Sequence, residues 1–164
     1  MKPLASEQRR RALLPLVLAA LVLPVCMTVA SAHDYDHGSL HVGHPWSRPT
    51  APGVPMAVAY LSITNHGTKE DVLLGAHTSA AAHVELHRTT ISNGMASMRP
   101  LAQVAIAPGQ TLHIEPGGIH LMLVDVKAPF VEGKNVPLTL EFRDAGFVDV
   151  ELEVESRDAS PAAK

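Results

Sequence analysis

Two histidines and two methionines in the second half of this chain stand at a spacing that suits a soft metal ion. Ten residues separate His87 from Met98, twenty-one separate Met98 from His120, and one separates His120 from Met122. Imidazole nitrogen together with thioether sulfur favours copper, and two thioethers favour Cu(I) in particular. These four residues are therefore the candidate metal ligands.

A second methionine competes with Met98 for this role. Met95 lies three residues earlier and nearer to the turn at Asn93-Gly94, which folds the chain back toward His87. Either sulfur can instead fill a hydrophobic gap. The residue types and the turn leave both methionines open as ligands.

Histidines also gather near the N-terminus, where they form a second candidate site. Four of them follow at spacings of four, four and three residues: His33, His37, His41 and His44. Imidazole and carboxylate ligands suit Cu(II) better than Cu(I). Cleavage before His33 would also give this residue a free amine, which could chelate Cu(II) together with the imidazole ring. The alternative is a solvated His-rich segment with weak, nonspecific metal affinity.

The candidate ligands fall on segments in which apolar and polar residues alternate. Alternation of this kind predicts half-buried strands over 83–87 and 119–124, with the apolar side chains facing a core. His120 and Met122 then share the outer face of one strand, close enough to bind one ion. The residues expected to face outward on the two strands are His83, Glu85, His87, His120 and Met122.

The rest of the chain reads as short strands separated by Gly, Pro and Asn turns, with no helical periodicity of useful length. This pattern predicts an all-β fold, a β-sandwich of Greek-key type. We expect Met56 to pack in its core. The predicted organisation is a signal peptide (1–32), a His-rich segment (33–45), the β-sandwich domain (46–155) and a disordered tail (156–164).

The first 32 residues have the features of a secretory signal peptide. Arg9, Arg10 and Arg11 precede a short apolar run, and Ala30-Ser31-Ala32 is a cleavage motif. An uncleaved membrane anchor is the alternative. Cys26 follows Val25, where a lipoprotein signal needs a small residue, so we expect cleavage after Ala32 and no stable membrane insertion. Sec and twin-arginine export both remain open.

Removal of this segment would change both charge and sulfur chemistry. Nine basic and fifteen acidic residues would remain, a net charge of −6, which argues against nucleic acid and anionic membranes as partners. No cysteine would remain, because the only one is Cys26. Methionine must then supply any sulfur ligand in an oxidising compartment.

Several segments of the chain resemble one known family. These are Pro45-Trp46-Ser47-Arg48, the run 57–65, Val84-Glu85-Leu86-His87, Met98-Arg99-Pro100 and the run 116–122. The sequence is similar to the PCuAC family of periplasmic copper chaperones, whose signature is H-x10-M-x21-H-x-M. The resemblance spans about residues 39–155 and matches the signature without a gap.

The resemblance implies a cupredoxin-like fold that binds one Cu(I) at an exposed site through His87, Met98, His120 and Met122. It favours Met98 over Met95 as the sulfur ligand. It also implies a non-enzymatic protein that delivers copper to the CuA centre of cytochrome c oxidase subunit II, alongside a Sco-type protein. The His-rich N-terminal segment departs from this pattern and leaves the number of copper ions per chain open.

Three other functions compete with the chaperone. Copper storage or resistance would bind the same ion without passing it on. A copper-dependent enzyme could use His33, although no substrate cleft can be argued from the sequence. An immunoglobulin-like module with incidental His and Met would show no tight affinity for Cu(I).

Overall fold

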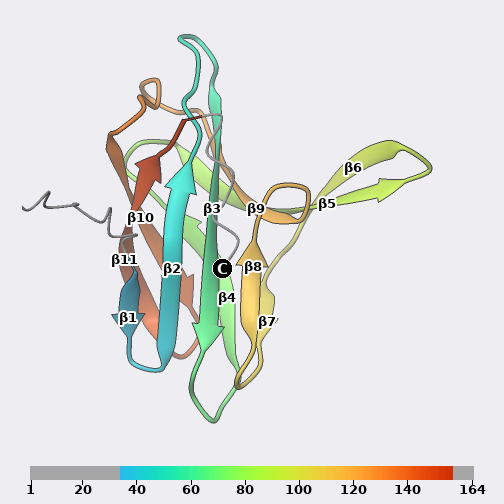
Figure 1. The fold of residues 1–164 in the computed structure, drawn as a ribbon, viewed down its shortest axis with the longest axis vertical. Coiled ribbons are helices and arrows are strands. Elements are labelled where there is room, and N and C mark those ends of the chain that lie inside the picture. The colour runs from blue at the N-terminus through green and yellow to red at the C-terminus, as the bar shows by residue number, and fades with distance from the viewer. Residues whose placement is uncertain (1–33, 157–164) are drawn as a thin grey trace, which may run out of the picture. The chain divides into compact units, whose positions relative to one another are not determined.

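The computed structural model describes residues 34–156, and every regular element in this range is a β-strand, as the sequence predicted (Figure 1). The predicted signal peptide, its cleavage site, His33 and residues 157–164 lie outside the described part. Within residues 34–156 there is accordingly no apolar helix of membrane-spanning length. The strands are β1 (Tyr35–His37), β2 (Leu40–Ser47), β3 (Met56–Asn65), β4 (Asp71–His77), β5 (His83–Ser92), β6 (Met95–Pro100), β7 (Val104–Ile106), β8 (Thr111–Ile114), β9 (Ile119–Val124), β10 (Asn135–Phe142) and β11 (Gly146–Val154).

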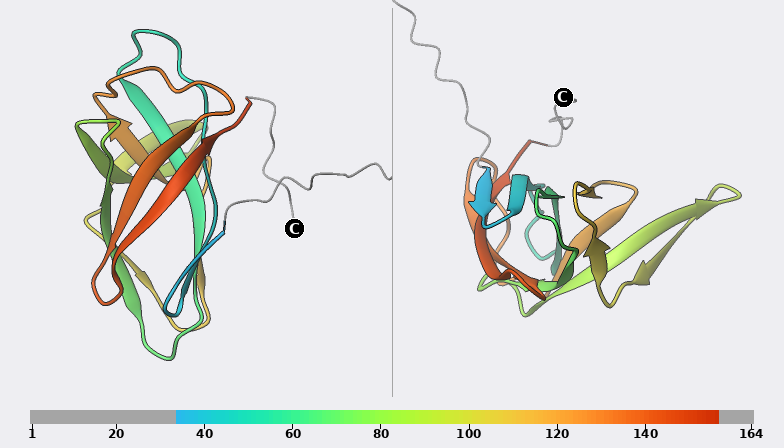
Figure 2. Two further views of the ribbon diagram at one scale, coloured as in Figure 1. Left: turned by 90° about the vertical axis from the view of Figure 1, so that its left-hand side faces the viewer. Right: turned by 90° about the horizontal axis from the view of Figure 1, so that it is seen from below.

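These strands form one hydrogen-bonded sheet that folds over a shared core. Their order is β6-β5-β9-β8-β3-β2-β11-β10-β4-β7, with β1 paired to β2 and a further pairing of β9 with β3. In Figure 2, β10 and β11 lie on one side of the domain and β8 and β9 on the other. Most pairs are antiparallel, whereas β2 with β11 and β8 with β9 are parallel.

Strict alternation along the strands builds the core between these two sides. In β3 the residues Ala57, Ala59, Leu61 and Ile63 are at most 4% exposed, and β11 buries every second residue in the same way. Our placement of Met56 in the core is wrong. It belongs to the outward set of β3 and is 48% exposed.

The segment predicted as a His-rich lead-in is part of the domain from residue 35 onward. Strands β1 and β2 form a hairpin, and β2 continues along β3. Leu40 and Val42 are almost completely buried, and the hydroxyl of Tyr35 accepts a hydrogen bond from the backbone N–H of Glu151 at 3.0 Å. The expected boundary at residue 45 therefore falls inside a strand, because two alternating apolar side chains carry this segment into the core.

The hairpin of β5 and β6 projects from the domain (Figures 1 and 2). Its six residue pairs run from His87 opposite Pro100 to Ser92 opposite Met95. Asn93 and Gly94 have φ angles of 53° and 75°, the left-handed conformation that a two-residue turn of this kind requires. The turn predicted at Asn93-Gly94 is confirmed, and every residue of β6 is exposed.

Candidate metal centre

The two candidate histidine ligands lie directly opposite each other on neighbouring strands. β5 pairs with β9 in antiparallel register, and His87 is the partner of His120. Their ring centroids are 5.9 Å apart, and the ring planes are inclined by 52°. Residues 33 positions apart in the sequence thus present two imidazoles to the same place on the sheet.

The pairing register also decides which methionines share the face of these imidazoles. Met122 is the partner of Glu85, and Met98 is the partner of Thr89, so each lies one diagonal step from His87. Cross-strand partners project to the same face, and alternate residues of a strand do so too. Both sulfur atoms therefore belong to the face that carries the two histidines.

Met95, the competing ligand, belongs to the other face of the hairpin. It is the partner of Ser92 and stands an odd number of residues from Met98. Successive side chains on a strand point to opposite faces. The register therefore supports Met98 rather than Met95 as the fourth ligand, in agreement with the spacing of the family signature.

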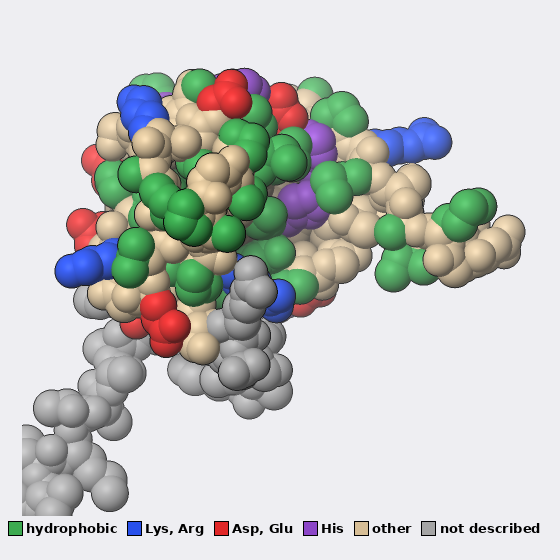
Figure 3. Space-filling view, turned by 90° about the horizontal axis from the view of Figure 1, so that it is seen from above, with side chains coloured by type: hydrophobic (Ala, Val, Ile, Leu, Met, Phe, Trp, Pro, Cys, Tyr) green, Lys and Arg blue, Asp and Glu red, His purple; other side chains and the backbone are tan. Residues whose placement is uncertain are grey.

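The four candidate ligands differ strongly in exposure. His120 is 5% exposed and the side chain of His87 11%, whereas Met98 is 54% exposed. Our expectation of an exposed site thus describes Met98 but not the histidines, because the two imidazoles pack against one another where β5 meets β9. Figure 3 shows histidine side chains beside the projecting hairpin, with hydrophobic side chains around them.

Hydrogen bonds hold one nitrogen of each imidazole. Nδ1 of His120 lies 3.2 Å from the carbonyl oxygen of Gly118, and Nε2 of His87 lies 2.8 Å from a carboxylate oxygen of Glu85. Nδ1 of His87 is buried and has no hydrogen-bond partner within residues 34–156. A buried polar atom without a partner is unusual in a folded protein. A bound metal ion would satisfy it, so the residues present fit a soft cation.

Sulfur donors are essential to this site. Among residues 34–156, no three side chains of His, Cys, Asp or Glu converge as a metal site would require. The pair of imidazoles needs Met98 and Met122 to complete a four-ligand set. All four ligands are neutral, which suits Cu(I) better than a harder divalent ion.

The N-terminal histidines that are described do not form a comparable cluster. His37 is the partner of Leu40 and His41 the partner of Asp36, so the two imidazoles project to opposite faces of the hairpin. Nδ1 of His41 bonds the carboxylate of Asp36 at 2.8 Å. His44 instead bonds the carboxylate of Glu155 and stacks on Trp46. The pairing of β1 with β2 therefore separates ligands that the sequence spacing seemed to gather.

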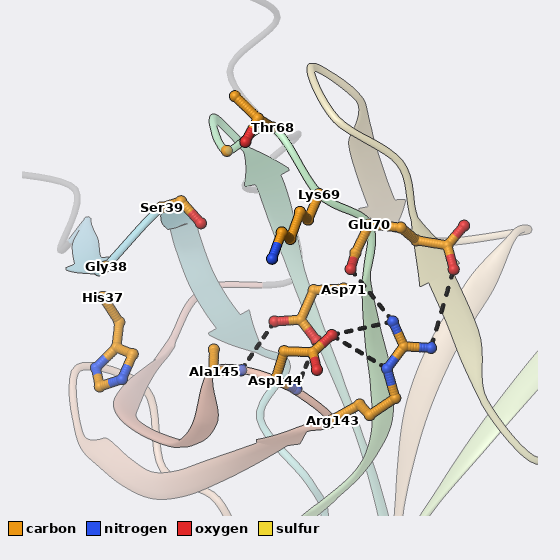
Figure 4. A pocket seen from close by; sticks show the side chains of 11 residues that line it. His37, Gly38, Ser39, Thr68, Lys69, Glu70, Asp71, Arg143, Asp144 and Ala145 are labelled. Carbon is orange, nitrogen blue, oxygen red and sulfur yellow. Dashed lines mark hydrogen bonds and ion pairs between the residues drawn. The ribbon is translucent and has the colours of Figure 1, made fainter.

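A depression of about 800 Å³ at another place has a structural explanation (Figure 4). Its floor contains the buried carboxylate of Asp71, which accepts hydrogen bonds from the backbone N–H groups of Val72, Asp144 and Ala145 at 2.7–3.0 Å. Arg143 is paired with Asp144 at 3.0 Å. Asp71, Arg143 and Asp144 are thus held by one another and by the backbone, which gives these polar groups a structural role.

Solved structures with this architecture include a copper-bound domain and a Cu(I)-bound protein. The copper-bound PCuAC domain from PmoF2 aligns with a TM-score of 0.66 and 27% identity over 76% of this chain and 98% of that one. The solution structure of CuI-DR1885 from Deinococcus radiodurans aligns with a TM-score of 0.58 and 28% identity over 79% of this chain and 85% of that one. The fold and the ligand spacing thus define a domain of the PCuAC class, and the predicted cupredoxin-like fold is confirmed.

The sequence itself places the chain within a family. The family model described as "Putative lipoprotein LpqE-like" matches residues 40–154. A relative from Leifsonia xyli subsp. xyli, named "Putative lipoprotein Lxx21020", is 34% identical over 116 residues, which cover 70% of this chain and 69% of the relative. The chain belongs to the LpqE-like family.

Proposed function

We propose that this protein is a copper chaperone that binds one Cu(I) ion through His87, Met98, His120 and Met122. The observation that carries the proposal is the direct cross-strand pairing of His87 with His120, with two thioether-bearing residues on the same face. The copper-bound state of the PmoF2 domain and the Cu(I) state of DR1885 support copper as the cargo.

The ligand chemistry suits a carrier that must release its metal. Two imidazoles and two thioethers neutralise none of the charge of the ion, so the ion is held less firmly than by thiolates. Electron-transfer copper sites rely on a cysteine thiolate, and the only cysteine here is Cys26, in the predicted signal peptide. Reversible binding without catalysis is the function that this donor set favours.

The gradient of exposure across the site suggests how the ion leaves. Met98 is more than half exposed on the projecting hairpin, whereas His120 is buried and the side chain of His87 is only 11% exposed. The ligands of an acceptor can replace the exposed thioether first, while the imidazoles still hold the ion. The recipient that we propose, from the family resemblance, is the CuA centre of cytochrome c oxidase subunit II, with a Sco-type protein as a second partner.

We place this function outside the cytoplasm, in the periplasm. The predicted signal peptide supports export, and so does the lipoprotein name of the Leifsonia xyli relative. That name also supports an alternative in which Cys26 is lipidated and anchors the protein, because a lipoprotein is attached to the membrane through its N-terminal cysteine. Cleavage after Ala32 and lipidation at Cys26 yield different mature N-termini, which makes the two readily distinguishable.

Anaerobic titration with Cu(I) against a chromogenic chelator tests the proposal. Wild-type protein is expected to bind one tight Cu(I) per chain. Met122→Leu should weaken binding at least about tenfold, or about 1.4 kcal/mol, because one of four ligands is lost. Met95→Leu is the matched control, since Met95 is exposed but projects to the opposite face of the hairpin from the proposed ligands.

Three outcomes would contradict the proposal. Absence of tight binding by the wild type would favour an immunoglobulin-like module with incidental His and Met. Tight binding that no acceptor can draw on would favour storage, which a transfer assay with the soluble CuA domain of subunit II would reveal. Equal losses of affinity in Met122→Leu and Met95→Leu would contradict the assigned set of ligands.

A further inference from the structure

We propose that Glu85 is a positioning residue that keeps the proton of His87 on Nε2, so that His87 binds Cu(I) through Nδ1. This inference rests on the proposed copper site and adds to it the binding atom of each imidazole. Glu85 precedes His87 by two residues on β5 and is the cross-strand partner of Met122, so it lies at the edge of the ligand set.

The contact between Glu85 and His87 determines where the imidazole proton resides. Oε2 of Glu85 lies 2.8 Å from Nε2 of His87. An ionised carboxylate only accepts hydrogen bonds, so Nε2 must be the donor. In a neutral imidazole the other nitrogen then carries a free lone pair. Glu85 therefore selects the tautomer in which Nδ1 of His87 is available to a metal.

The surroundings of Nδ1 agree with this role. It is buried and has no hydrogen-bond partner among the described residues. Leaving such an atom unpaired costs folding free energy, and sites that tolerate it are often functional. A metal ion bound at Nδ1 would satisfy the lone pair without disturbing the hydrogen bond to Glu85.

Coordination through Nε2 would be less favourable. It would require the loss of a charge-assisted hydrogen bond, and it would leave Nδ1 buried as before. The other carboxylate oxygen of Glu85, Oε1, lies 3.3 Å from Nε2 of the half-exposed His83. The carboxylate thus lies between two imidazoles, with its shorter contact directed at the buried one.

His120 has the opposite arrangement. Its Nδ1 lies 3.2 Å from the carbonyl oxygen of Gly118, and a carbonyl can only accept. Nδ1 of His120 therefore carries the proton, and Nε2 carries the lone pair. The two histidines are expected to bind the same ion through unlike nitrogens, Nδ1 from His87 and Nε2 from His120. Hydrogen-bonded partners of this kind orient metal-binding imidazoles in many proteins.

Nitrogen-15 NMR of histidine-labelled protein tests the assignment, because protonated, bare and metal-bound ring nitrogens have distinct chemical shifts. In the metal-free protein, His87 should show a protonated Nε2 and a bare Nδ1. On addition of Cu(I), the shift of Nδ1 in His87 should change strongly, whereas in His120 the shift of Nε2 should change. Binding of Cu(I) by Nε2 of His87 would overturn the inference.

The metal-free spectrum separates this inference from the proposed function. If no Cu(I) binds, the proposed function fails. The tautomer of His87 in the metal-free protein still shows whether Glu85 holds the proton on Nε2. A protonated Nδ1 of His87 in the metal-free protein would overturn the role assigned to Glu85, whatever the result with Cu(I).

Variants at position 85 supply a second readout. Glu85→Ala should shift His87 toward the other tautomer and lower the affinity for Cu(I) by about 10- to 100-fold, the usual loss when a partner of a metal-binding histidine is removed. Glu85→Gln retains an accepting oxygen and should fall between Ala and the wild type. Unchanged tautomers in Glu85→Ala would contradict the inference.

A matched control separates this effect from a general loss of charge. Glu151→Ala removes a carboxylate on β11 that accepts a side-chain hydrogen bond from Asn135 at 2.8 Å, the same length as the bond to His87. It should leave the tautomer of His87 and the Cu(I) affinity unchanged. An equal loss of affinity in Glu151→Ala would show that position 85 acts only through overall charge.

Discussion

His87 and Met98, two of the proposed copper ligands, differ in how they are exposed and held. The side chain of His87 is 11% exposed and held by Glu85, whereas Met98 is 54% exposed and has a rotatable thioether. A buried, hydrogen-bonded ligand selects and orients the ion. An exposed, flexible ligand can be displaced by an acceptor with little reorganisation. At the scale of single residues, burial thus separates retention of the metal from its release.

The exposure of Met98 leads to a prediction about its oxidation. Exposed methionines are converted to sulfoxides by mild peroxide, and a sulfur atom that donates a lone pair to a soft metal is a weaker and more crowded nucleophile. Ag(I), a redox-inert soft ion, should therefore protect Met98 but not Met95, which is 73% exposed on the other face of the hairpin. Peptide mass spectrometry of the two sulfoxides measures this, and equal protection of both would count against Met98 as a ligand.

Strand β5 is the element on which the site depends. Residues 83–88 pair with β9, and residues 87–92 pair with β6, so the strand links the domain to the projecting hairpin. His87 stands where these two ladders overlap, opposite both His120 and Pro100. The next pair in the hairpin, Arg88 with Arg99, sets like charges opposite each other, which weakens strand pairing. The position of Met98 therefore relies heavily on the turn.

We predict that Gly94→Ala loosens the hairpin and weakens Cu(I) binding. Gly94 has a φ of 75°, and a side chain in this conformation costs about 1 kcal/mol or more. Amide hydrogen exchange in β6 should accelerate several-fold, and the affinity should fall because Met98 is ordered less often.

Gly75→Ala is the control for this change. Gly75 lies in β4, a Cβ there would meet nothing within 4 Å, and its φ is outside the left-handed range. It should leave both the exchange rates of β6 and the affinity as in the wild type. Unaltered binding by Gly94→Ala, together with faster exchange in β6, would mean that the hairpin does not contribute a ligand.

At the scale of the whole molecule, hydrogen bonds of Asp71 join the start of β4 to the turn between β10 and β11. Asp71 at the start of β4 is 6% exposed and accepts three backbone N–H bonds, two of them from the turn between β10 and β11. These bonds join strands that are far apart in sequence (Figure 4). The residues of this connection are therefore separate from the proposed metal ligands.

This separation predicts the effect of Asp71→Ala. The substitution leaves three N–H groups without their acceptor and should lower the free energy of unfolding by at least about 2 kcal/mol. Urea unfolding measures the loss, and Cu(I) affinity of the folded fraction should not change. Asp149→Ala, which removes an exposed carboxylate bonded to Thr139 at 2.6 Å, should cost far less. A comparable cost for both would contradict the structural role assigned to Asp71.

The mature N-terminus is a further property of the whole molecule that can be measured. We predict that the exported protein begins at His33, because Ala30-Ser31-Ala32 is a signal-peptidase motif. Intact-mass analysis of protein from the periplasm would show this. A lipid-modified protein that begins at Cys26 would contradict it and would agree with the lipoprotein names in the family.

Local patterns in the sequence determined much of this protein. Period-two alternation identified the strands near 83–87 and 119–124, because burial of one sheet face imposes that period. The Asn93-Gly94 pair identified the hairpin, since few other residues accept its φ angles. Residue types alone indicated copper, because thioethers and imidazoles are soft and intermediate donors.

Only the tertiary structure decided how these pieces meet. The pairing of β5 with β9 brings His87 to His120, and no local pattern specifies which distant strands become neighbours. Burial of both imidazoles and the unpaired Nδ1 of His87 follow from that pairing. In the N-terminal hairpin the sequence spacing suggested a cluster of histidines, whereas the pairing of β1 with β2 places His37 and His41 on opposite faces. The alternation within one strand determines to which face of the sheet a side chain projects. Which other side chains lie beside it depends on strand pairings between distant parts of the chain, and these are selected by the fold as a whole.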